Sequence, residues 1–199
     1  KTTMKKRKKQ ETVNQSEYLQ QSCACNYRCS DLSGKPRKSN GRNKMKKIWI
    51  TGAEGHIGTA LLDLLEGVEY QLLPTDIEEV DITKIDEVTQ FVHVNRPDVV
   101  INCAGLTDVQ ECENNVDEAY RVNAIGVRNV ALAANEVNAK VIQISTDDVF
   151  DKESRVPYNE FDNVHPRTIY GKSKEAGEKI LTQLLNRFVI IRSSWIWIS

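Results

Sequence analysis

The sequence predicts an α/β protein built on a doubly wound parallel sheet, and three observations lead to that prediction. Short apolar runs alternate with longer stretches of helical periodicity from residue 45 onward. A glycine-rich turn follows the first run, and a Tyr-x-x-x-Lys pair opens the last helical stretch. Strand–helix alternation places the strands parallel and the helices on both faces of the sheet. We expect strands near 47–51, 70–75, 98–103, 140–145 and 188–192, and helices near 57–66, 83–94, 114–137 and 170–186.

The charge distribution divides the chain in two. The 199 residues carry 27 Lys and Arg against 28 Asp and Glu, for a net charge of −1. Residues 1–44 nevertheless hold 12 of the basic side chains and only Glu11, Glu17 and Asp31 as acidic ones, so the remainder is strongly acidic. This abrupt change marks a boundary, and the first segment is poor in large apolar residues. We therefore expect a basic, disordered tail over 1–44 and a folded domain over 45–199.

The tail contains two further motifs, and we expect neither to bind a ligand. The basic run Lys5-Lys-Arg-Lys-Lys9 can contact nucleic acid, but such runs are more often simply solvated, so we expect no nucleic-acid partner. Cys23, Cys25 and Cys29 lack a nearby fourth ligand for a structural zinc site, so we expect no metal.

Composition also bears on location. The chain has no apolar run of about 18 residues, the length that predicts a membrane span. No apolar signal segment follows the basic N-terminus. Cys103 and Cys112 are typical of reduced cysteines in a cytosolic protein. We therefore expect a cytoplasmic protein without a membrane partner.

The glycine-rich turn predicts a dinucleotide site. Gly52, Gly55 and Gly58 follow the first apolar run and precede a leucine-rich helix, which is the Rossmann-like context that this interpretation requires. Gly52 allows a tight turn, Gly55 lets the backbone approach a pyrophosphate, and Gly58 lets the helix pack on the sheet. The helix N-terminus offers free N–H groups to phosphate. His56 is more typical of a turn side chain near the phosphates than of a catalyst.

The ends of the next two strands predict the rest of the cofactor site. Asp76 closes the second strand, where an acidic residue can bind the adenosine ribose and favour NAD(H), although a solvated loop aspartate is an equal alternative. Asp81 and Ile82 are the next polar–apolar pair and can bracket the adenine ring. The small-residue turn Cys103-Ala-Gly105 would let a cofactor lie flat against the backbone.

Thr146, Tyr170 and Lys174 predict proton transfer at a sugar-like oxygen. Tyr170 and Lys174 lie four residues apart, which places them on one face of a helix. The ammonium favours the phenolate, so we expect Lys174 to lower the pKa of Tyr170 from about 10 toward neutrality. Thr146 should lie at the carboxyl end of a buried strand, where α/β sheets bind ligands. A lone Tyr-x-x-x-Lys is usually a surface pair, but together with the strand-end threonine and the glycine turn it indicates a nicotinamide-dependent enzyme.

Read in order, these segments resemble the extended short-chain dehydrogenase/reductases, and most of all the dTDP-4-dehydrorhamnose reductase family. The resemblance covers the chain from Met45 onward, in segments 51–58, 97–105, 120–129, 145–151, 157–160, 170–178 and 192–195. It implies a Rossmann-like NAD(P)-binding domain. It also implies hydride transfer from NADPH or NADH to the C4 ketone of a nucleotide-linked 4-keto-6-deoxyhexose, as in dTDP-L-rhamnose biosynthesis.

The resemblance assigns roles to individual residues. Tyr170 would donate the proton to the developing alkoxide, Lys174 would also hold the nicotinamide ribose, and Thr146 would hydrogen-bond the carbonyl oxygen. The residues that would contact the cofactor are Gly52, Gly55, His56, Ile57, Gly58, Asp76, Asp81, Ile82, Cys103, Ala104, Gly105, Asn123, Ser145, Tyr170 and Lys174. Those that would contact the nucleotide-sugar substrate are Thr107, Asp147 and Trp195.

Two departures from the family pattern keep alternatives open. Asp148 stands where the family usually has tyrosine, so that Thr146-Asp-Asp148 resembles the acidic motif of sugar-nucleotide 4,6-dehydratases. Family members also continue beyond this point into a substrate lobe that is largely missing from these 199 residues. We therefore expect the chain to bind dinucleotide far better than it turns over substrate. A dehydratase or epimerase, or a regulatory subunit like that of methionine adenosyltransferase, stays an alternative.

The same resemblance leads to a hypothesis about assembly. In the extended family, the region that corresponds to the helix at 114–137 and the helix that carries Tyr170 and Lys174 often form a dimer surface. A homodimer is therefore expected as a partner relation in addition to the nucleotide-sugar substrate.

Overall fold

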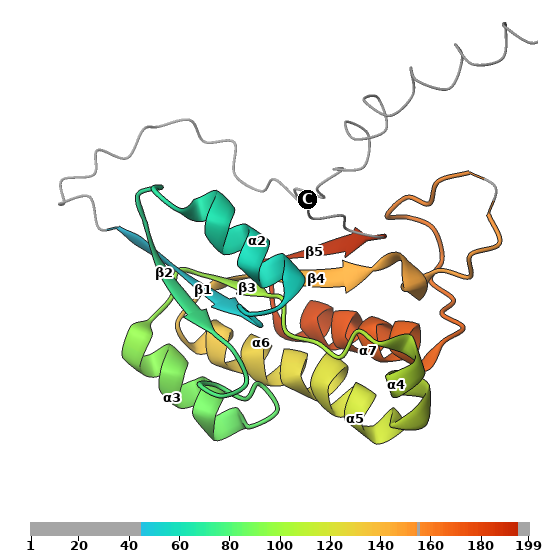
Figure 1. Cartoon of the computed structure of the whole chain (residues 1–199), viewed down its shortest axis with the longest axis horizontal. Coiled ribbons are helices and arrows are strands. Elements are labelled where there is room, and N and C mark those ends of the chain that lie inside the picture. The colour runs from blue at the N-terminus through green and yellow to red at the C-terminus, as the bar shows by residue number, and fades with distance from the viewer. Residues whose placement is uncertain (1–44, 155, 195–199) are drawn as a thin grey trace, which may run out of the picture.

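Five parallel strands form the centre of the protein in the computed structural model, which describes residues 45–154 and 156–194 (Figure 1). The strands follow the order β2-β1-β3-β4-β5 across the sheet. Their bounds are β1 Lys46–Thr51, β2 Tyr70–Thr75, β3 Val99–Asn102, β4 Lys140–Thr146 and β5 Phe188–Ser193. The predicted tail over 1–44, with its three cysteines, and the predicted substrate residue Trp195 lie outside the described residues.

Helices cover both faces of the sheet, which confirms the predicted fold class. Helix α2 lies on one face, and α3, α6 and α7 lie on the other (Figure 1). The main helices are α2 His56–Leu65, α3 Ile85–Asn95, α6 Val127–Glu136 and α7 Ile169–Leu184. In the part of the chain that the structure describes, no helix is long and apolar enough to cross a membrane.

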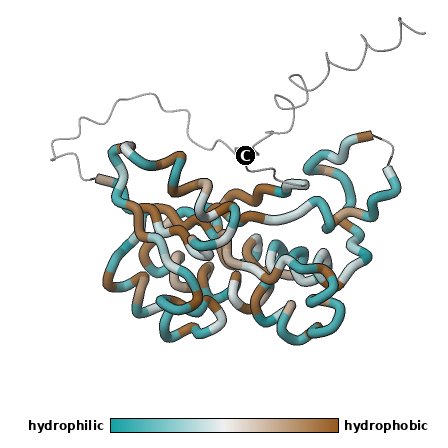
Figure 2. The backbone as a smooth tube through the Cα atoms, viewed as in Figure 1, coloured by the Kyte–Doolittle hydropathy of each residue, from teal (hydrophilic) through white to brown (hydrophobic). Residues whose placement is uncertain are grey.

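The core consists of two layers that follow the alternation of side chains along the strands. Trp49 is fully buried on the face that α3 and α6 cover. Its ring centre lies 4.9 Å from that of Phe91, and its Nε1 donates to Oγ1 of Thr75 at 2.9 Å. Its neighbours Ile48 and Ile50 point to the opposite face and pack against the leucines of α2. Figure 2 shows the hydrophobic strands between more hydrophilic helices and loops. These contacts hold β1 between β2 and β3, with the glycine turn directly after it.

The helix expected over 114–137 is divided in the structure. It consists of α5 Val116–Tyr120, the π-helical turn η1 Arg121–Gly126 and then α6. A Cβ atom at Gly177 of α7 would lie 2.2 Å from the carbonyl oxygen of Asn123, so the backbone of α7 packs directly against η1. Sequence periodicity carries no signal for this insertion, because π-turns follow from packing and often occur at functional sites. A further short helix, α4 Val109–Asn114, was not expected.

The strand order places a topological switch point between β1 and β3. Chain connections leave these two strands in opposite directions across the sheet, and ligands of such sheets bind outside the carboxyl ends at this point. The register pairs Thr51 with Thr75 and with Asn102, so β1, β2 and β3 end at the same edge. The residues that follow these ends are those predicted to bind a dinucleotide.

Candidate active site

The glycine turn is shaped by contacts that only glycine permits at two positions. Gly52 has a φ of +63°, and a Cβ atom there would lie 2.7 Å from the backbone nitrogen of Ala104. At Gly58 a Cβ atom would lie 2.2 Å from the carbonyl oxygen of Gly52. Gly55 precedes α2, which has no side-chain cap. The first turn of α2 therefore packs tightly against the end of β1 and keeps its N–H groups available to an anion. Two residues between Gly55 and Gly58 were also predicted to contact the cofactor. His56 is exposed, and Ile57 is half-buried.

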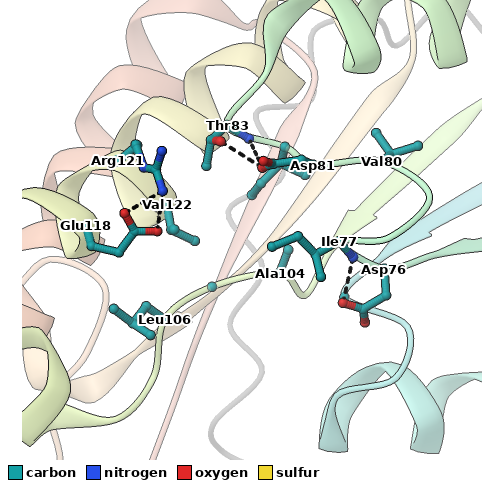
Figure 3. Close-up of a pocket in the computed structure, with 13 residues that line it drawn as sticks. Asp76, Ile77, Val80, Asp81, Thr83, Ala104, Leu106, Glu118, Arg121 and Val122 are labelled. Atoms are coloured by element: carbon teal, nitrogen blue, oxygen red, sulfur yellow. Dashed lines mark hydrogen bonds and ion pairs between the residues drawn. The ribbon is translucent and has the colours of Figure 1, made fainter.

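A pocket opens beside this turn, between the loop after β2 and the start of η1 (Figure 3). Six of its lining residues were predicted to contact the cofactor: Gly52, Asp76, Asp81, Ile82, Ala104 and Gly105. No sequence motif predicted the others, which include Ile77, Leu106, Glu118, Arg121 and Val122. These come from loops, from α5 and from η1, whose orientations depend on the tertiary fold. Cys103 precedes Ala104 and is half-buried next to the pocket wall.

Two carboxylates of the pocket are held by hydrogen bonds. Asp76 accepts from the backbone nitrogen of Glu54 at 2.9 Å and from that of Ile77 at 2.8 Å, so it bridges the glycine turn and the β2 loop. Asp81 accepts from the nitrogen of Thr83 at 2.9 Å and from its Oγ1 at 2.7 Å. Partial burial raises the pKa of Asp81, but the Thr83 hydrogen bonds and the charge of Lys84 together outweigh burial and keep it below its usual value.

The start of α7 brings Tyr170 to the end of β4. Thr168 caps the helix by accepting from the backbone nitrogen of Gly171 at 3.0 Å. A Cβ atom at Gly171 would lie 2.2 Å from the carbonyl oxygen of Asp148, so the helix begins directly against the residues after β4. Thr146 ends that strand, and its hydroxyl interacts with the phenol of Tyr170. The two side chains predicted to act on one substrate oxygen therefore lie together.

Lys174 lies one turn further along α7, on the same face. It is buried, with an exposed fraction of 7%, and its Nζ donates to the carbonyl oxygen of Ile144 at 2.8 Å. Burial lowers its pKa from the ordinary 10.5 to about 8. A Cβ atom at Gly105 would lie 3.5 Å from Nζ, so the ammonium faces the turn after β3. Thr146, Tyr170 and Lys174 thus converge at one edge of the sheet, as predicted.

The pKa of Tyr170 differs from the expectation. Burial raises it, the hydrogen bond with Thr146 lowers it, and the nearby charges of Asp148 and Asp147 raise it further. The net direction is upward, whereas we expected Lys174 to lower it. The reason is that desolvation of the phenol and two carboxylates act on Tyr170 directly, while the Lys174 ammonium is held on a backbone carbonyl.

Asn123 holds the turn after β3 against α7. This side chain of η1 is buried, accepts from the nitrogen of Leu106 at 2.9 Å and donates to the carbonyl oxygen of Leu106 at 2.9 Å. It also donates to Oγ of Ser173 at 3.0 Å. All three hydrogen bonds go to protein groups, so the structure places Asn123 behind the predicted cofactor surface as its support.

Of two other predicted contacts, Ser145 has a protein partner in the structure and Thr107 lies at the surface. Ser145 was expected to contact the cofactor, but its hydroxyl donates to Oε1 of Glu178 at 2.5 Å inside the fold. Thr107 is exposed, immediately before α4. Both strand-end hydroxyls reach α7, but Ser145 meets Glu178, two turns beyond Tyr170, and Thr146 meets Tyr170 itself.

The acidic pair after Thr146 does not resemble a free acid–base dyad. Asp148 forms an ion pair with Lys152, and its side chain is 11% exposed. Asp147 is half-buried beside it, at 3.5 Å from Oγ1 of Thr146. The Asp148 carboxylate is thus bound by a cation, which weighs against the dehydratase alternative. Within the described ranges, no group of three or more His, Cys, Asp or Glu side chains could hold a metal ion.

Comparisons with known proteins agree with this geometry. The family model of the RmlD substrate binding domain matches residues 45–199. A dTDP-4-dehydrorhamnose reductase of Aggregatibacter actinomycetemcomitans is 41% identical over 152 residues, which cover 76% of this chain and 52% of the relative. The spore coat polysaccharide biosynthesis protein SpsK of Bacillus subtilis is 36% identical over 153 residues, which cover 77% and 54%.

A solved structure supports the same likeness. The dTDP-4-dehydrorhamnose reductase of Bacillus anthracis in complex with NADP is 44% identical, with a TM-score of 0.75, over 77% of this chain and 54% of that one. The chain therefore spans about half the length of the relatives that it matches.

Proposed function

Because the chain belongs to the RmlD substrate binding domain family, we propose that it carries the cofactor-binding and proton-donating residues of a nucleotide-sugar reductase. The reaction is the reduction of the C4 ketone of a dTDP-linked 4-keto-6-deoxyhexose, with NADPH or NADH as the reductant. The observation that carries the proposal is the convergence of Thr146, Tyr170 and Lys174 at the end of β4, beside a pocket formed at the switch point. The relatives named for this reaction, and the NADP bound to one of them, support it.

The residues present fit a dinucleotide. The uncapped start of α2 and the close packing at Gly52 suit a pyrophosphate. The pocket from Asp76 to Asp81 would hold the adenosine, with the Asp76 carboxylate already anchored at the end of β2. A side chain at Gly105 would meet Asn123 and Lys174, so glycine at this position lets both of them pack closely against the turn after β3. When bound there, the cofactor supplies the hydride.

The protein's own residues supply the proton and orient the carbonyl. Thr146 donates a hydrogen bond to the carbonyl oxygen, and Tyr170 transfers its proton to the same oxygen as the C4 carbon is reduced, so the ketone becomes a hydroxyl. Lys174 stabilises the resulting phenolate by its charge. Its pKa of about 8 leaves it mostly protonated at neutral pH, yet close enough to neutrality to return a proton to Tyr170. The raised pKa of Tyr170 keeps the acid protonated until substrate arrives.

The decisive experiment compares cofactor oxidation with cofactor binding. Loss of reduced-nicotinamide absorbance is followed on addition of a dTDP-4-keto-6-deoxyhexose, and NADPH fluorescence gives the dissociation constant. Tyr170→Phe should lower kcat by about 10²- to 10⁴-fold and leave the dissociation constant within about twofold. Tyr70→Phe is the matched control, because this half-exposed residue lies at the start of β2, at the opposite end of the strands from the site.

Each outcome decides between the functions. Oxidation that Tyr170→Phe removes and Tyr70→Phe leaves intact supports the reductase. NADPH binding without oxidation, both in this chain and in the longest protein that the gene encodes, would contradict it and favour a regulatory subunit. Turnover of the sugar without net loss of reduced cofactor would favour a dehydratase or epimerase.

Assembly and location complete the proposal. We infer a homodimer through the surface of α5 and η1, where Val116 and Ile125 are partly exposed. Light scattering of the purified protein tests the homodimer, since a monomer mass at micromolar concentration would contradict it.

Cys103 and Cys112 are free thiols, which supports a cytoplasmic location.

A further inference from the structure

A buried ion pair lies one helical turn beyond the active-site lysine and has no part in the reaction described above. Glu178 of α7 is 4% exposed, and Arg192 of β5 donates to it from Nη2 at 2.6 Å and from Nε at 3.1 and 3.2 Å. Ser145 of β4 adds a third donor at 2.5 Å. The carboxylate thus joins α7 to two strands, and Arg192 and Ser145 between them occupy both of its oxygens.

The spacing along α7 places this carboxylate within reach of the active-site ammonium. Tyr170, Lys174 and Glu178 follow one another at intervals of four residues, so they form a row on one helix face. Lysine and glutamate at this spacing usually attract each other, and burial strengthens the attraction. Lys174 nevertheless donates to the carbonyl oxygen of Ile144. Its ammonium therefore stays beside Tyr170 and Gly105.

We propose that Arg192 is a positioning residue for the proton donor, because it occupies the Glu178 carboxylate and so keeps Lys174 on the Ile144 carbonyl. This inference rests on the function proposed above. Without Arg192, Glu178 would be a buried carboxylate with no counter-ion, a strongly unfavourable state. Lys174, one turn away, would turn toward it and leave the active site.

Arg192 is itself held in place from its other side. The guanidinium lies 5.1 Å from the centre of the Phe150 ring, in the geometry of a cation–π contact. Phe150 stacks on Tyr158 with ring centres 4.4 Å apart, and the Tyr158 hydroxyl donates to Asp151 at 2.5 Å. The loop after β4 therefore fixes the arginine, which cannot follow a moving carboxylate.

The charge of Glu178 is the property that the test must isolate. The titratable groups that act on Lys174 are Glu178 of its own helix, Cys103 after β3 and Cys112 of α4. Those that act on Tyr170 are Asp147 and Asp148 after β4, together with Cys112. Arg192 can affect the reaction through Glu178 without a change in any of the others.

The experiment is a double-mutant cycle on the full chain. Arg192→Met keeps the length of the side chain and removes the charge, and Glu178→Gln keeps the hydrogen bond to Ser145 and removes the other charge. Arg192→Met should lower kcat by at least about tenfold with little change in the dissociation constant of NADPH. The double variant should recover most of the lost kcat, because no carboxylate remains to capture Lys174. Arg187→Met, at an exposed arginine that donates to the carbonyl oxygen of Asn138, is the matched control.

A second readout needs no substrate and separates this inference from the proposed function. Acylation of Lys174 is measured by mass spectrometry across pH in each variant. In Arg192→Met the pKa of Lys174 should rise from about 8 toward the value of an ordinary lysine, since the ammonium gains a carboxylate partner, and it should fall again in the double variant. Identical acylation profiles in the wild type and Arg192→Met would overturn the inference. So would a double variant as impaired as Arg192→Met, because the pair would then serve structure alone. Arg192→Lys, which keeps a cation, reports on folding if Arg192→Met is unstable.

Discussion

The burial of Lys174 shows how a single residue can oppose the stability of the fold that contains it. Its ammonium group is enclosed between α7, β4 and the turn after β3, with a backbone carbonyl as hydrogen-bond partner. The fall of its pKa from 10.5 to about 8 corresponds to about 3 kcal/mol, at 1.36 kcal/mol for each pH unit. Natural proteins accept such a cost at functional positions, which supports a chemical role for Lys174.

We predict that Lys174→Met stabilises the protein at pH 7 and abolishes reduction. Methionine fills a similar volume and cannot be charged, so the free energy of unfolding should rise by roughly 1–3 kcal/mol. The wild type should become more stable between pH 8 and pH 10.5, because the unfolded chain then binds more protons at this lysine than the folded one. The variant should lack this gain. Urea denaturation at pH 7 and pH 10 measures both effects, with the exposed Lys172→Met as control. A variant destabilised equally at both values would contradict the prediction.

At the scale of single elements, the packing of α7 against η1 determines where the side chains predicted to be catalytic lie. Helix α7 carries Tyr170 and Lys174, and its approach to η1 is close enough that a Cβ atom at Gly177 would lie 2.2 Å from the backbone oxygen of Asn123. Asn123 in turn holds the turn after β3 by two hydrogen bonds to Leu106. The π-helical turn, helix α7 and the predicted cofactor surface therefore depend on one another.

We predict that Gly177→Ala destabilises the protein, although alanine is the better helix former. In an exposed helix this substitution would stabilise by about 1 kcal/mol. Here the new methyl group would meet a backbone oxygen, which cannot move without displacing η1, so we expect a loss of at least about 2 kcal/mol. Reduction should fall as well. Gly67→Ala is the control, because its added Cβ meets nothing within 4 Å and only its φ of +78° opposes the change. Chemical denaturation of both variants measures the free energy of unfolding. A more stable Gly177→Ala variant would show that α7 and η1 can move apart without loss of stability.

The sequence predicts the strands better than it predicts the helices of the site. Runs such as Val141–Ile144 are buried on one face and half-buried on the other, so the β-branched residues alone predict a strand of the sheet. The short helix α4 carries mostly exposed polar side chains and depends on a cap by Asp108, which gives no periodic pattern. The break at Arg121–Gly126 depends on Gly177, about 50 residues away along the chain, and no local pattern contains that contact.

At the scale of the whole molecule, the order of the strands assembles a site from residues that are distant in sequence. Gly52, Gly105 and Lys174 were each predicted from local motifs, and the switch point between β1 and β3 brings their segments together. Local motifs could not predict the direction in which each side chain points. Ser145 was expected to face the cofactor, but the pleat of β4 turns its hydroxyl to Glu178. Pocket residues such as Arg121 lie on a helix face that only the tertiary fold selects.

The division of charge along the chain leads to the last prediction, which concerns residues 1–44. The family match begins at residue 45, and β1 already pairs with β2 and β3, so no strand from the tail can pair with β1. We predict that deletion of 1–44 leaves the dissociation constant of NADPH within about twofold at physiological ionic strength. At that ionic strength the Debye length of about 8 Å screens distant charges. The melting temperature should also be unchanged.

Fluorescence titration of both proteins at low and physiological salt makes this measurement. At low salt the 12 basic side chains should raise the affinity of the longer protein for the phosphates of the cofactor, because screening is weak. A comparable protein in which the basic run 5–9 is replaced by uncharged residues is the matched control and should behave like the deletion. An affinity that falls by tenfold or more at both salt concentrations would mean that the tail contributes contacts to the site. The boundary predicted at residue 44 would then be wrong.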